Sequence, residues 1–118
     1  MAFIADDQVL LAKVRHVLQI ADKPIYYGAL ARDLDVPGPG AIAKVTAALE
    51  AMMQADFDAG RPFVAAMCEG KLSGGLPALG FFQMAQALGR YGGPVAGPEA
   101  VAFVAHQRAL LARLRLTD

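Results

Sequence analysis

The run from Asp35 to Gly40, with sequence DVPGPG, constrains this chain more than any other feature because it cannot continue a helix. Proline fixes φ and lacks a backbone donor, and glycine readily adopts positive φ. On both sides of the run, apolar residues recur at helical spacing. The sequence therefore predicts a tight turn between a short helix over residues 28–34 and a longer helix over residues 41–57.

Further proline and glycine positions divide the rest of the chain into segments of one element each. A 118-residue chain is the size of one domain. The other predicted elements are helices over residues 8–21, 81–88 and about 98–115, a short extended segment over residues 25–27, and a strand over residues 62–68.

These elements predict a mainly α fold with a small β component. Their order is that of a winged helix-turn-helix-like single domain with added terminal helices. The helix-turn-helix would cover about residues 25–57, a possible wing residues 69–77, and the terminal helix about residues 98–115.

Residues 24–49 contain a sequence pattern that is found in a known family. A Tyr27-Gly28 pair opens a helix, Leu30-Ala31 follows, and an alanine-rich helix comes after the turn. This stretch resembles the helix-turn-helix of the alkylguanine-DNA alkyltransferases and their inactive relatives, which implies a DNA-binding layout. Their active site is a Pro-Cys-His-Arg motif, whereas here Cys68 is followed by Glu69. The resemblance therefore does not imply alkyl transfer.

A second stretch, residues 61–90, is similar to an uncharacterised bacterial winged-helix-like family. The matching tripeptides are Gly60-Arg61-Pro62, Gly75-Leu76-Pro77 and Gly80-Phe81-Phe82. This resemblance implies the fold and brings no activity with it.

The charge balance limits the possible partners. Eleven Lys and Arg residues meet eleven Asp and Glu residues, so no net field attracts nucleic acid or an anionic membrane, and a DNA site must be a local patch. Glu50, Asp56 and Asp58 lie on the predicted recognition helix and would repel phosphate. The candidate contacts to duplex DNA are Lys44, Arg61, Lys71, Tyr27 and Gln54.

The sequence contains no recognisable catalytic, metal-binding or cofactor-binding motif. His16 and His106 lie on polar helix faces without a second ligand at metal-binding spacing, and no phosphate-loop pattern is present. Cys68 is the only cysteine and falls in an apolar segment, where a thiol behaves as a small hydrophobe. We therefore expect a protein that is not an enzyme and that uses no metal and no cofactor.

Surplus apolar residues on the terminal helices favour self-association. Hydrophobic residues make up 56% of the chain, a high share for a lone domain. The candidates for a homodimer interface are Val9, Ile20, Val101, Leu110 and Leu114. Two functions thus stay open: a DNA-binding, transcription-regulator-like protein, or a protein-protein interaction or dimerisation module without nucleic-acid binding. No secretory signal or membrane span is expected, which predicts a cytoplasmic protein.

Overall fold

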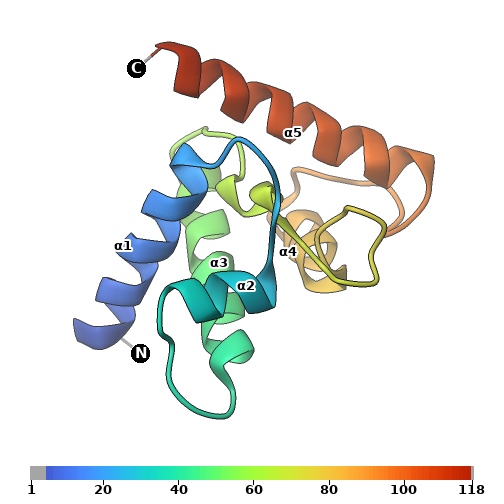
Figure 1. Cartoon of the computed structure of the whole chain (residues 1–118). Coiled ribbons are helices and arrows are strands. Elements are labelled where there is room, and N and C mark those ends of the chain that lie inside the picture. Colours follow the sequence, from blue (N-terminus) through green and yellow to red (C-terminus); the bar gives the residue numbers. More distant parts are fainter. Residues whose placement is uncertain (1–4, 118) are drawn as a thin grey trace.

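The computed structural model describes residues 5–117 of the chain, with side chains from Gln8 to Leu116. The expectation that no secretory signal begins the chain rests partly on residues 1–4, which lie outside this range. Figure 1 shows the helices α1 (Ala5–Ile20), α2 (Tyr27–Asp33), α3 (Ala41–Asp58), α4 (Leu79–Leu88) and α5 (Pro98–Thr117). A 3₁₀ turn, η1 (Val64–Met67), and two short strands, β1 (Ile25–Tyr26) and β2 (Cys68–Glu69), complete the described elements. The prediction of a mainly α fold with a small β component is confirmed.

Helix α3 is the centre of the packing. Its apolar positions recur at helical spacing, so one face is buried against α1, α2 and α4. The turn predicted before α3 is present, and Asp35, Gly38 and Gly40 all have positive φ, at 53°, 75° and 82°. The Val36 amide donates to the Ala31 carbonyl and closes the end of α2. The proline and glycine run therefore separates the two helices as the sequence predicts.

The predicted strand over residues 62–68 is wrong for most of its length. Residues 64–67 form the 3₁₀ turn η1, and only Cys68 pairs as a strand. Side chains rather than a neighbouring strand accept the first backbone donors of this segment. The Phe63 amide donates to Gln107 and the Val64 amide to Asp56, at 2.8 and 3.0 Å. A short, fully buried apolar run has the same pattern in a strand and in a helical turn, so periodicity cannot separate them.

The two strands pair in parallel, with Ile25 beside Cys68 and Tyr26 beside Glu69. The predicted wing, residues 69–77, continues from β2 into a loop in which the Gly70 amide donates to the Leu76 carbonyl. No strand follows Glu69 in this segment. The winged form of the fold therefore stays a prediction.

Helix α5 lies across the other helices, and its C-terminal end approaches the C-terminal end of α1 (Figure 1). Its buried residues, Ala100, Val104, Gln107 and Leu111, recur at helical spacing and face η1. No helix in the described part of the chain is both long and apolar enough to cross a membrane.

Candidate functional site

A groove of about 590 Å³ lies where the C-terminal ends of α1 and α5 meet the end of α3. One part of its lining is apolar and the other is strongly basic. The apolar lining consists of Ile20, Pro62, Val64, Leu111 and Leu114. Among the described residues, the charged lining consists of Arg15, Arg61 and Arg115 and one carboxylate, Asp56.

Asp56 is almost fully buried, with 1% of its side chain exposed, and both of its oxygens accept bonds. Oδ1 accepts Nη1 of Arg15 at 2.9 Å and pairs with Nη2 of Arg61 at 3.2 Å. Oδ2 accepts the backbone amide of Val64 at 3.0 Å. Burying a carboxylate is costly unless it is paired and hydrogen-bonded, and Asp56 meets both conditions.

The end of α3 places Arg61 beside Asp56. Gly60 has a φ of 68°, a left-handed conformation that commonly ends helices. The chain then turns back, and the Arg61 amide donates to the Asp56 carbonyl at 2.8 Å. Gly60 therefore terminates α3.

Arg90 fixes the backbone of Arg61 from the other side. Its guanidinium lies over the Phe63 ring at 4.2 Å and over the Phe57 ring at 5.5 Å. Its Nη1 donates to the Arg61 carbonyl at 2.6 Å. Such stacking leaves Arg90 engaged in the fold, while the guanidinium of Arg61 faces Asp56.

A second, smaller pocket of about 140 Å³ lies between α2, α3 and α4. It is mostly apolar and is lined by residues that include Tyr27, Ile42, Thr46, Leu49 and Phe81. The Tyr27 hydroxyl accepts the Ala78 amide at 2.9 Å, and burial raises the pKa of Tyr27 to about 12. Tyr27, a predicted nucleic-acid contact, is therefore engaged in holding the start of α4.

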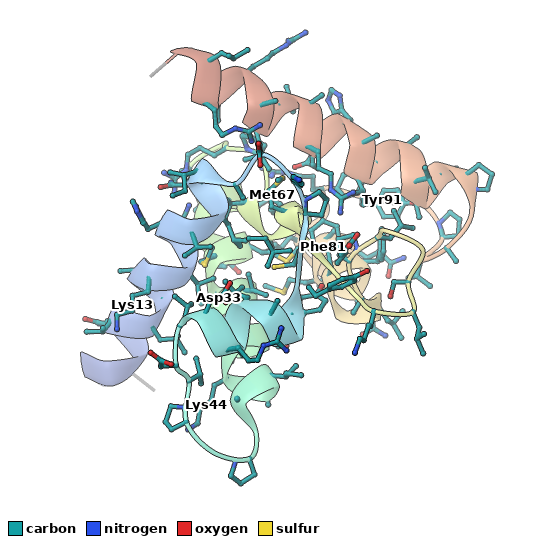
Figure 2. The ribbon with its side chains drawn as sticks, in the orientation of Figure 1. Lys13, Asp33, Lys44, Met67, Phe81 and Tyr91 are labelled. Carbon is teal, nitrogen blue, oxygen red and sulfur yellow. The ribbon has the colours of Figure 1, made fainter. Side chains whose placement is uncertain are left out.

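The structure separates the other predicted DNA contacts. Lys44 is exposed in the first turn of α3, whereas Asp56 and the neighbouring Arg61 lie roughly 18 Å further along the helix axis. Figure 2 shows Lys44 at the end of the molecule opposite α5. Gln54 donates to Asp58 at 2.9 Å. Lys71 is exposed in the loop after β2. Because Lys44 and Arg61 lie at opposite ends of α3, they do not share one basic face.

The predicted dimer residues are also divided. Ile20 and Leu114 line the same groove. Val9 is exposed roughly 16 Å away along α1, and Val101 is exposed roughly 20 Å away along α5. Leu110 is half-buried. The structure thus brings together two of the five residues, one from each terminal helix.

Sequence reasoning missed Arg15, Arg115 and the role of Asp56. It treated Asp56 as a charge along the recognition helix that would repel phosphate, whereas in the structure Asp56 is buried and paired with arginines. A signal was present, since Asp56 continues the apolar stripe of Val45, Leu49 and Met52 at helical spacing. An acid on a buried stripe requires cationic or hydrogen-bonding partners.

The remaining reactive side chains are not assembled into a catalytic group. Burial raises the pKa of the Cys68 thiol to about 12, so the thiol stays protonated at neutral pH. The described residues contain no group of three or more His, Cys, Asp or Glu side chains that could hold a metal ion. The groove is therefore the strongest candidate site in the described part of the chain.

No family model, curated protein or solved structure matches this chain.

Proposed function

We propose that this chain is a non-enzymatic protein-interaction module that binds a partner protein through the groove between α1 and α5. One observation carries the proposal: Ile20 and Leu114 remain 65% and 46% exposed in a groove that three arginines line, two of them paired with the buried Asp56. Arginine and partly exposed apolar side chains around a concave surface are typical of the residues that dominate binding at protein interfaces.

The surface of α3 supports a protein partner better than DNA. Phosphate binding requires several cations on one face, and base reading requires hydrogen-bonding side chains. Before its last turn, the exposed side of α3 presents one cation, Lys44, and one amide, Gln54, which donates to Asp58. Its other exposed positions there include Ala43, Ala47 and the anionic Glu50. The arginines gather instead at the far end of this helix.

A partner that differs from this chain fits the groove better than a second copy. In a two-fold contact each copy presents the same patch to the other. Near the axis, Arg15, Arg61 and Arg115 would then face their own counterparts, and like charges across an interface are unfavourable. The homodimer remains the competing proposal, and light scattering over a wide concentration range separates the two.

Selection from a random peptide display library tests the proposed function. We expect peptides that bind the native protein and lose binding to Leu114→Asp, because this change places a charge in the apolar wall of the groove. Val101→Asp is the matched control, since Val101 is exposed on the same helix outside the groove. Thermal unfolding of both variants checks that they are folded. If no enriched peptide distinguishes Leu114→Asp from Val101→Asp, the proposal is wrong.

DNA binding is the second candidate, and the order of α2, the tight turn and α3 with Lys44 exposed in the first turn favours it. Fluorescence anisotropy with a duplex oligonucleotide tests it. This candidate predicts binding that weakens steeply with salt and that Lys44→Ala reduces by a similar factor for all sequences. The absence of binding at low salt would exclude it.

A further inference from the structure

The described lining of the groove contains more positive than negative side chains. Asp56 accepts Arg15 and Arg61 on one oxygen and the Val64 amide on the other, so both oxygens are occupied. Arg115 also lines the groove and forms no hydrogen bond or ion pair with another described residue. Of the described residues, Asp56 is the one acid in the lining of the groove. The described lining therefore holds three cations and one carboxylate, whereas the formal charges of the whole chain sum to zero.

Most of the guanidinium donors in the groove are unused. A guanidinium carries about five N–H donors in a rigid plane. Arg15 and Arg61 each direct one terminal nitrogen to Asp56. The Asp56 carboxylate therefore fixes the two guanidiniums in position while leaving donors for a further acceptor. A planar carboxylate matches such donors in pairs.

Partial burial strengthens this attraction. The Arg15 side chain is only 20% exposed, so solvent screens its charge less than that of the exposed Arg61. The three guanidiniums carry like charges, and one carboxylate is the only anion in the described lining, so they also repel one another. An added carboxylate would therefore gain attraction and relieve repulsion at once.

The apolar lining indicates what kind of molecule would present the added carboxylate. Ile20, Leu111 and Leu114 lie in the same groove as the arginines, so an occupant has to be acidic at one point and aliphatic beside it. A nucleic-acid backbone presents phosphates without aliphatic groups beside them, whereas a peptide with Asp or Glu next to Leu, Ile or Val has both.

We propose that Arg15, Arg61 and Arg115 bind an aspartate or glutamate side chain of the partner protein, whose neighbouring aliphatic residues cover Ile20 and Leu114. Asp56 acts as the positioning residue for Arg15 and Arg61. This inference rests on the proposed function and adds the chemistry by which the partner is recognised.

The test uses the tightest peptide from the display selection and the same peptide with every Asp and Glu replaced by Asn and Gln. Calorimetric titration should show at least tenfold weaker binding of the amide peptide, the effect of losing a charge-assisted hydrogen-bonded pair. Arg115→Gln should weaken binding of the acidic peptide by a similar factor. Arg113→Gln is the matched control, because Arg113 is exposed on the same helix and does not line the groove.

The possible results separate this inference from the proposed function. If the acid and amide peptides bind within twofold of each other while Leu114→Asp still abolishes binding, the proposed function stands and carboxylate recognition is wrong. Carboxylate recognition is also wrong if Arg115→Gln and Arg113→Gln have equal effects. Displacement of the peptide by millimolar inorganic phosphate, with no preference for the acid peptide, would identify a phosphate site and overturn the inference.

Discussion

Asp56 is the residue on which the groove depends, and its replacement should show this directly. Asp56→Asn keeps the shape of the side chain but removes the charge that Arg15 and Arg61 share. Loss of one partner of a buried pair leaves the others uncompensated, and solvent reaches both arginines in part, so we expect a loss of roughly 2 to 3 kcal/mol in the free energy of unfolding.

Urea unfolding measures this loss, with Asp58→Asn as control. Asp58 is exposed and accepts one bond from Gln54, so its replacement should cost less than about 0.5 kcal/mol. Equal losses for the two variants would show that the Asp56 pairing does not stabilise the fold.

Cys68 makes stability depend on pH in the alkaline range. Burial raises the pKa of its thiol from 9.0 to about 12 in the folded protein. The unfolded chain therefore ionises near pH 9 while the folded thiol remains protonated. Its stabilising contribution is complete below pH 9 and is lost as the pH rises toward 12. Burial of Tyr27 acts in the same direction, from 10.0 to about 12.

Denaturant unfolding at pH 8 and at pH 10.5 tests this dependence. The native protein should lose more stability between the two pH values than Cys68→Ala, because both proteins retain Tyr27 and only one retains the thiol. An equal loss in the two proteins would mean that the thiol is not protected in the folded state.

At the scale of elements, Arg108 ties α5 to the loop after β2. Its Nε donates to the Ala66 carbonyl at 2.8 Å and its Nη2 to the Gly75 carbonyl at 2.9 Å. Arg108→Met keeps much of the apolar stem and removes these donors. We expect faster amide hydrogen exchange across residues 70–77, because the loop loses its hydrogen bond from α5 to the Gly75 carbonyl. Arg113→Met should leave this exchange unchanged. Equal exchange in both variants would show that the Arg108 hydrogen bonds do not stabilise the loop.

The elements show what sequence patterns can and cannot predict. Proline, glycine and helical periodicity place all five helices close to their observed bounds, because these signals are local. Local signals could not predict the 3₁₀ turn over residues 64–67, since the amides of Phe63 and Val64 at its start donate to Gln107 and Asp56, which other elements supply. Tertiary packing, rather than local propensity, decided this segment.

At the scale of the whole molecule, the groove exists only because three elements converge. Arg15 lies 41 residues before Asp56 in the chain, and Arg115 comes from the last helix. Sequence reasoning identified Ile20, Leu114 and Arg61 separately, assigning the first two to a dimer and the third to DNA. No spacing in the sequence shows that they share one groove, so the site had to come from the fold.

The proposed binding face of this protein is the groove between α1 and α5. Nuclear magnetic resonance titration of the labelled protein with the selected peptide, and separately with a duplex oligonucleotide at low salt, tests it most directly. We predict that the peptide shifts the methyl signals of Ile20 and Leu114 and the side-chain Nε–H signals of Arg15 and Arg61, while signals around Lys44 stay in place. Shifts centred on Lys44 and the first turn of α3 upon addition of DNA, with no movement of the groove signals by the peptide, would contradict the account.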